Sequence, residues 1–100
     1  MPARLPIEAE TLRAFCQRHG IRRLALFGST LRGTAGPASD VDLLVEFEQG
    51  RTPGLIAMAG MERELSALLG GRRVDLRTPG DLSRHFRDEV LREATPQYGA

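Results

Sequence analysis

The chain has 100 residues, of which 41% are apolar and 27% are charged, as in one small globular domain spanning residues 1–100. Its 14 basic residues nearly balance its 13 acidic residues, which leaves a net charge of +1. Because general nucleic-acid-binding proteins carry a strong basic excess, we expect no direct nucleic-acid binding. All 14 basic residues are arginine, which excludes a Schiff-base lysine and a phosphate-loop lysine.

Cysteine content and hydropathy restrict the setting of the protein. Cys16 is the single cysteine, so the chain contains neither an internal disulfide nor a cysteine-based zinc site. The sequence has no run of 18 apolar residues, and its first residues lack the apolar centre of a signal peptide. We therefore expect a cytoplasmic protein that does not enter a membrane.

The first third of the chain is predicted to contain a helix and a strand. Apolar residues three and four apart predict a helix over 7–19, which Gly20 ends. The short apolar run in 22–27 predicts a buried strand. The small residues of 28–36 then predict a turn that leads into one short helical turn.

Residues 40–47 are predicted to form the second strand, because apolar and polar residues alternate there. One face carries Val41, Leu43, Val45 and Phe47, and the other carries Asp40, Asp42, Leu44 and Glu46.

The second half predicts a helix, a strand and a last helix. Residues 55–69 have the spacing of an amphipathic helix, and 72–77 that of a short strand. A final helix is expected over 81–94, followed by a frayed tail that Tyr98 anchors. Its inward side is predicted to comprise Leu82, Phe86, Val90, Leu91 and Ala94.

The connection lengths predict how the strands are arranged. Only twelve residues separate Phe27 from Asp40, whereas a parallel crossover usually needs a dozen or more residues that are mostly helical. The first two strands are therefore expected to be antiparallel, and the longer connection through 55–69 allows the second and third to be parallel. We expect an α/β (α+β) fold with a small mixed sheet flanked by helices.

Three aspartates are the candidate catalytic and metal-binding residues. Asp40 and Asp42 project from the same face of a strand, with Cα atoms about 6.5 Å apart, and can converge on a divalent cation. Asp75 occupies a strand position that the fold can bring beside them. Oxygen ligands suit a hard ion such as Mg²⁺ or Mn²⁺. Glu46 shares their face and is a weaker candidate, and Arg77 is predicted either to contact a phosphate or to pair with an acid.

A phosphate site is predicted immediately after the first strand. Gly28 permits close approach to the backbone, and the amides after it can point at an anion from a helix N-terminus. Ser29 adds a hydroxyl donor, and Arg32 adds a forked positive donor one turn later.

These residues together resemble a known family. Gly28-Ser29, ten intervening residues and Asp40-Val41-Asp42 match the GSx10DxD signature of the polymerase-beta-like nucleotidyltransferase superfamily. The longer string GSTLRGTAGPASDVDLLVEF is similar to its minimal bacterial branch, the MNT proteins, and Asp75 stands where that branch has its third carboxylate. The resemblance covers nearly the whole chain.

The resemblance implies transfer of a nucleoside monophosphate from a nucleoside triphosphate. Gly28, Ser29 and Arg32 are expected to hold the triphosphate, and the three aspartates to hold two Mg²⁺ ions. Minimal MNT proteins are typically paired with a HEPN-domain toxin, which they neutralise as antitoxins and can adenylylate on a tyrosine. The leading hypothesis is therefore an antitoxin that transfers AMP from ATP to its HEPN partner, as a hetero-oligomer or alternatively a homodimer.

Two other hypotheses remain at this point. One is a small-molecule nucleotidyltransferase of the antibiotic-modifying type. The other is an antitoxin that neutralises by binding alone, which aspartate-to-asparagine variants would distinguish because such an antitoxin does not need catalysis.

Overall fold

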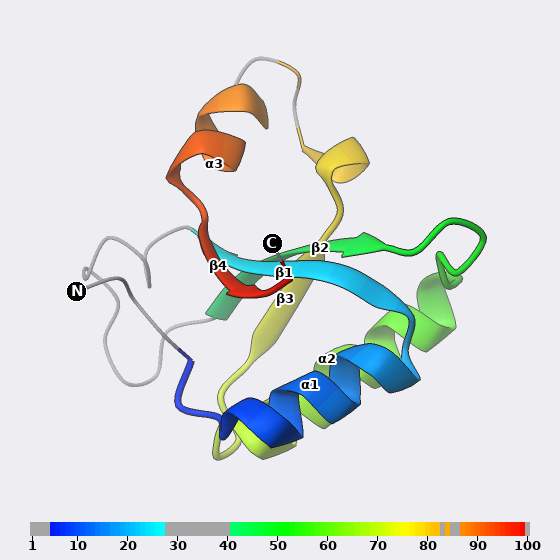
Figure 1. Ribbon diagram of the computed structural model, residues 1–100, viewed down its shortest axis with the longest axis vertical. Coiled ribbons are helices and arrows are strands. Elements are labelled where there is room, and N and C mark those ends of the chain that lie inside the picture. Colours follow the sequence, from blue (N-terminus) through cyan, green and yellow to red (C-terminus); the bar gives the residue numbers. More distant parts are fainter. Residues whose placement is uncertain (1–4, 28–40, 83, 85–86, 100) are drawn as a thin grey trace.

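The computed structural model describes residues 5–27, 41–82, 84 and 87–99 (Figure 1). Within these residues the chain forms three α-helices, one 3-10 helix and four strands. In chain order they are α1 (Ala9–Arg18), β1 (Ile21–Phe27), β2 (Val41–Phe47), α2 (Leu55–Leu68), β3 (Val74–Arg77), η1 (Pro79–Asp81), α3 (Arg87–Glu93) and β4 (Thr95–Tyr98). Among the described helices, none has the length and apolar character that a membrane crossing requires.

The strands form one mixed sheet in the order β3-β2-β1-β4. β1 pairs with β2 in antiparallel orientation, and β2 pairs with β3 in parallel orientation. The antiparallel orientation was predicted from the short connection and is confirmed, and the parallel one is the orientation that the longer connection allows. The α+β class with a mixed sheet is also confirmed. β4 runs antiparallel to β1 at the other edge.

The main hydrophobic core lies between one face of the sheet and the helices α1 and α2, which cover that face (Figure 1). The predicted alternation in β2 is confirmed, because Val41, Leu43 and Val45 are all fully buried in this core. From the helices the core receives Leu12, Phe15, Cys16, Met61 and Leu65. Burial of these side chains is the main force that holds the helices against the sheet.

The opposite face of the sheet carries a smaller apolar cluster and most of the polar strand residues. Ala25 and Leu44 are buried there with Leu82, and half-buried Phe27, Val90 and Ala94 pack against them. Helix α3 lies on this side, across the sheet from α1 and α2 (Figure 1). This second face is covered less completely than the first.

The helix predicted over 81–94 is confirmed only in its second half, as α3, and the short helix η1 ends at Asp81 before it. The backbone N–H and the hydroxyl of Thr78 donate to Oδ2 of Asp81 at 3.1 and 3.0 Å, which closes η1 and lowers the pKa of Asp81. Leu82 then takes an extended conformation, so the helix cannot continue. Leu82, Val90 and Ala94 do face inward as expected, but Leu91 is 41% exposed. Phe86 lies outside the described residues.

Strand β4 was not predicted, and the frayed tail expected in its place is wrong. β4 pairs with β1 through Leu24↔Tyr98, Ala25↔Pro96 and Leu26↔Thr95. Pro96 argues against a strand in the sequence, because proline cannot donate a hydrogen bond within a sheet. It is tolerated here because β4 is an edge strand. Tyr98 does anchor the tail, since it is half-buried against the main core.

We expect the backbone immediately after β4 to require glycine at position 99. Its φ is +83°, and a Cβ atom there would lie 2.3 Å from the carbonyl oxygen of Arg22. We expect Gly99→Ala to lower the free energy of unfolding by about 2 kcal/mol, measured by urea denaturation. Gly50→Ala is the matched control, because Gly50 has φ +77° with nothing within 4 Å of the added Cβ. Equal losses in both variants would show that the close approach to Arg22 does not matter.

Candidate active site

Two of the three predicted carboxylates lie side by side in the sheet. Asp42 on β2 and Asp75 on β3 are direct partners in the parallel register. Directly opposite residues on adjacent strands project from the same face, with the strands about 4.8 Å apart. Asp42 also precedes Leu44 by two positions, so both aspartates share the face that carries the smaller apolar cluster. Two acidic oxygen donors therefore converge at this end of the sheet.

Asp75 is held by an arginine on its own strand. Nη2 and Nε of Arg77 both donate to Oδ2 of Asp75, at 3.0 and 3.2 Å. The side chain of Asp75 is 37% exposed, so this ion pair lies in contact with solvent. Of the two roles predicted for Arg77, the structure shows pairing with an acid.

An aromatic residue borders the carboxylates on the other side. Phe27 is the register partner of Asp42 across β1 and β2. It is half-buried and packs against the smaller apolar cluster. The row Phe27, Asp42, Asp75 thus crosses three strands, with an apolar wall at one end. Sequence reasoning did not place Phe27 beside the aspartates, because only the exact register identifies its neighbour.

The other predicted site residues, Gly28, Ser29, Arg32 and Asp40, lie outside the described residues. The strands on either side of them are described: β1 ends at Phe27, and β2 begins at Val41. Because Phe27 pairs with Asp42, the chain leaves β1 and enters β2 at the end of the sheet where the two aspartates lie.

The residues present fit a hard divalent cation. Carboxylate oxygens are the ligands that Mg²⁺ and Mn²⁺ prefer, and Asp42 and Asp75 present such oxygens from neighbouring positions on one face of the sheet. Among the described residues no group of three acidic, histidine or cysteine side chains surrounds one point. Asp42 and Asp75 supply two of the three carboxylates in the predicted set.

Glu46 does not join this pair. It lies four residues from Asp42 along β2, and its Oε1 and Oε2 accept from Arg22 and Arg23 at 3.1 and 3.3 Å. The weaker of the metal-ligand predictions is therefore not supported, because the two arginines already balance this carboxylate.

Cys16 and His19 belong to helix α1 and its end, on the far side of the sheet. Nε2 of His19 lies 3.0 Å from Oε1 of Glu64, and burial, together with Arg18 and Arg51, lowers the pKa of His19. Cys16 is fully buried, and burial raises the pKa of its thiol to about 12. Neither residue is placed to act at the aspartates.

The thiol of Cys16 should therefore be inert in the folded protein, because the thiolate is the reactive form and it is suppressed here. At pH 8 we expect no reaction with Ellman's reagent over minutes, and one thiol released after unfolding in guanidinium chloride. Rapid reaction of the native protein would contradict the burial of Cys16 in the main core.

The sheet brings two carboxylates to one point, as enzymes that transfer phosphoryl groups with divalent cations require. Residues 8–97 match the family described as the nucleotidyltransferase domain. Since this match covers most of the chain, the chain belongs to the nucleotidyltransferase domain family.

One curated relative and one solved structure show to which branch of this family the chain is most similar. The chain is 44% identical over 77 residues to the protein adenylyltransferase MntA of Thermococcus cleftensis, covering 77% of this chain and 75% of that protein. It is 45% identical to the solved structure of a candidate minimal nucleotidyltransferase, with a TM-score of 0.68 over 91% of this chain and 97% of the other. The chain thus lies in the minimal branch, close to protein adenylyltransferases.

The same fold occurs in a toxin–antitoxin complex. A structure of a tri-AMPylated Shewanella oneidensis HEPN toxin with its MNT antitoxin matches with a TM-score of 0.65 and 20% identity, over 92% of this chain and 70% of that one. At this identity the likeness shows the shared fold.

Proposed function

We propose that this chain is an antitoxin that transfers AMP from ATP to a tyrosine of a partner HEPN toxin and thereby neutralises it. The observation that carries the proposal is the register pairing of Asp42 with Asp75, which gives the family's chemistry two carboxylates at one point. Membership of the nucleotidyltransferase family and the 44% identity to a protein adenylyltransferase support it. The shared fold with an antitoxin bound to an AMPylated HEPN toxin supports the partner and a hetero-oligomer.

The proposal assigns each predicted residue a role. Gly28, Ser29 and Arg32 bind the triphosphate, since backbone amides, a hydroxyl and a guanidinium all donate to phosphate oxygens. Asp40, Asp42 and Asp75 would hold the divalent cations, two Mg²⁺ or alternatively Mn²⁺. These ions supply neutralisation of the charge that develops on the phosphates.

The reaction is an in-line displacement at the α-phosphorus of ATP. The tyrosine oxygen forms a bond to the α-phosphorus, and the bond from that phosphorus to the oxygen that bridges to the β-phosphorus breaks. Pyrophosphate leaves, and the phenolic proton passes to Asp75. Asp42 and Asp75 share a face that lies across the sheet from α1 and α2, so the acceptor approaches from the α3 side. ATP as donor and an unpaired Cys16 agree with a cytoplasmic location.

The direct test uses the purified protein and a candidate HEPN toxin partner. Both are incubated with ATP and Mg²⁺, and the intact masses are measured. We expect the toxin to gain the mass of one or more AMP groups on tyrosine, and to lose its toxicity in proportion. Bound ATP without any added mass on the toxin would overturn the transfer. If Asp42→Asn still neutralised the toxin fully, the protein would act by binding alone.

A further inference from the structure

Arg77 contacts the carboxylate of Asp75 through only one of its two oxygens. Nη2 and Nε of Arg77 both donate to Oδ2, at 3.0 and 3.2 Å. Among the described residues, no group donates to Oδ1 of Asp75. Oδ1 is therefore the oxygen of this carboxylate that stays available to a further ligand.

The ion pair lies on the face of the sheet that carries both aspartates. Asp75 and Arg77 are two positions apart on β3, so their side chains project from the same face. Asp42 is the register partner of Asp75, and Leu44 is that of Arg77. The guanidinium thus starts one row away from the two aspartates and reaches back to the row that contains them.

Two other carboxylates hold the backbone on either side of Arg77. β3 is an edge strand, so only one of its sides is bonded to another strand. The N–H of Leu76 donates to Oε2 of Glu62 on α2, at 2.7 Å. The N–H of Thr78 donates to Oδ2 of Asp81, at 3.1 Å. The guanidinium therefore extends from a backbone that is fixed at both neighbouring residues, although the strand lies at an edge.

A contribution to stability does not account for this arrangement. The side chains of Arg77 and Asp75 are 47% and 37% exposed, and ion pairs in contact with solvent contribute little to folding. Carboxylates that bind metal ions are commonly oriented by a second group that bonds to them. Loss of such a group typically reduces metal affinity or activity by about 10–100-fold. The contact of Arg77 with one oxygen of Asp75 is of this kind.

We propose that Arg77 is the positioning residue of Asp75: it holds Oδ2 and thereby orients the carboxylate so that Oδ1 is left for a divalent cation. Arg77 acts through Asp75 and does not contact the triphosphate. This inference rests on the proposed function and adds to it a residue that determines how tightly the cation is bound.

The test measures cation binding without any transfer of AMP. Mn²⁺ is titrated into nucleotide-free protein, and the free ion is measured by electron paramagnetic resonance. The variants are Arg77→Ala, Arg77→Lys, Asp75→Ala and Arg77→Ala combined with Asp75→Ala. Binding of a fluorescent ATP analogue is measured separately in the presence of EDTA.

Arg13→Ala is the matched control, because it removes the same charge from another exposed ion pair. Arg13 pairs with Glu10 at 2.6 Å on α1, which lies across the sheet from the aspartates (Figure 1). This variant should bind Mn²⁺ as the native protein does.

We expect Arg77→Ala to raise the Kd for Mn²⁺ about tenfold. Arg77→Lys should restore part of the affinity, because lysine keeps the charge but lacks the rigid fork of donors. Asp75→Ala should weaken binding further, and adding Arg77→Ala to it should change nothing more, since the arginine acts only through that carboxylate. In the transfer assay with the toxin, Arg77→Ala should need about tenfold more free Mg²⁺ for its half-maximal rate, with the KM for ATP unchanged.

The outcomes that overturn the positioning role differ from one another. Unchanged Mn²⁺ binding in Arg77→Ala overturns it, and tighter binding would show that the arginine competes with the cation. A loss that persists in the Asp75→Ala background would show that Arg77 acts elsewhere. Weaker binding of the ATP analogue to Arg77→Ala in EDTA would place the guanidinium on the triphosphate.

Failure of the proposed function has a separate signature. If Mn²⁺ binding follows the expected pattern but no toxin receives AMP, the positioning role stands and the proposed function fails. If the toxin receives AMP and Arg77→Ala matches the native protein in Mn²⁺ binding and in transfer, the proposed function stands and the positioning role fails.

Discussion

Asp42→Asn should reduce AMP transfer by about 10³-fold or more while the protein stays folded. Asparagine keeps the shape of the side chain but loses the charge that a divalent cation needs, and removing a group that stabilises phosphoryl-transfer charge typically costs this much. The fold should tolerate the change, because asparagine has nearly the same shape as aspartate and Asp42 is only half-buried, at the second residue of β2. The measurements are initial rates of transfer with saturating ATP and Mg²⁺, and the thermal unfolding midpoint.

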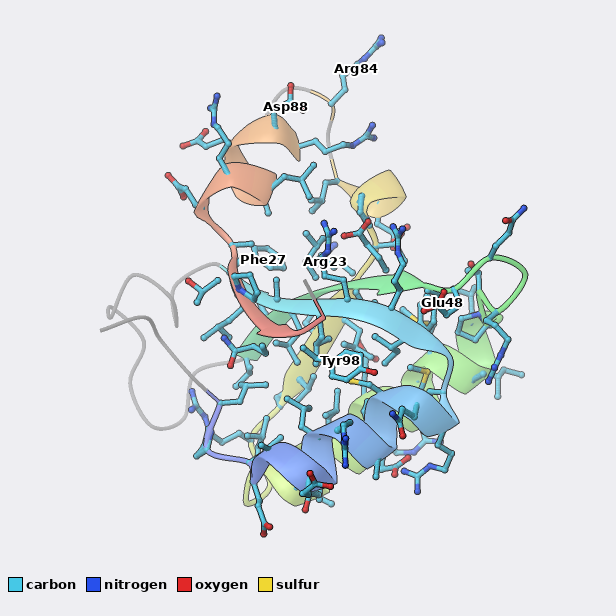
Figure 2. All side chains as sticks on the ribbon, in the orientation of Figure 1. Arg23, Phe27, Glu48, Arg84, Asp88 and Tyr98 are labelled. Carbon is cyan, nitrogen blue, oxygen red and sulfur yellow. The ribbon has the colours of Figure 1, made fainter. Side chains whose placement is uncertain are left out.

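Asp75→Asn should show the same loss of transfer. Its unfolding midpoint should move by a few degrees at most, because the ion pair with Arg77 is exposed to solvent and such pairs contribute little. Asp88→Asn is the matched control, since Asp88 is an exposed aspartate on α3 and should keep full activity (Figure 2). Full transfer by Asp75→Asn would remove that residue from the mechanism, and loss of folding in either variant would point to a structural role.

The parts of the fold that the sequence predicts are those with strong local signals. The alternation of β2 reveals its buried face, because a period of two can be satisfied only by a strand with one face in the core. The connection between β1 and β2 is too short for an ordinary parallel crossover, so the sequence also predicts that these two strands are antiparallel. The apolar spacing also predicted the ends of helices α1 and α2 to within two residues.

The parts that the sequence does not predict depend on contacts between distant segments. Leu82, Val90 and Ala94 have helical spacing, yet they do not lie on one helix. Leu82 follows η1, whereas Val90 and Ala94 belong to α3 and the residue after it, and all three pack in one cluster on the sheet. Their common burial therefore comes from the sheet and not from one helix. β4 has no strand pattern of its own and forms because the free edge of β1 accepts it.

The candidate site also has parts that the sequence predicts and parts that depend on contacts between distant segments. Spacing identified the aspartates, and the fold order placed Asp75 near them, but only the register shows that it lies opposite Asp42. A hollow of about 190 Å³ on the same face was not predicted, because its walls come from β1, β2, β4 and the α3 region. Nothing in the sequence predicts that Nε of Arg23 is buried, as it is in the structure.

Leu65→Ala should produce the largest loss of stability, about 3 kcal/mol in the free energy of unfolding measured by urea denaturation. Leu65 on α2 is fully buried in the main core, so alanine there leaves a cavity between the helix and the sheet. A domain of this size is stabilised by only about 5–15 kcal/mol, so the urea midpoint should fall markedly.

Leu68→Ala separates core packing from helix propensity, because Leu68 lies one turn later on the same helix and is 36% exposed. We expect this control to lose less than about 1 kcal/mol. AMP transfer by Leu65→Ala, assayed well below its unfolding midpoint, should stay near the native rate, since α2 covers the face of the sheet opposite to the aspartates. A large loss of transfer in a folded Leu65→Ala protein would show that the main core and the catalytic face are coupled through the sheet. Equal destabilisation by the two variants would instead show that α2 does not depend on packing at Leu65.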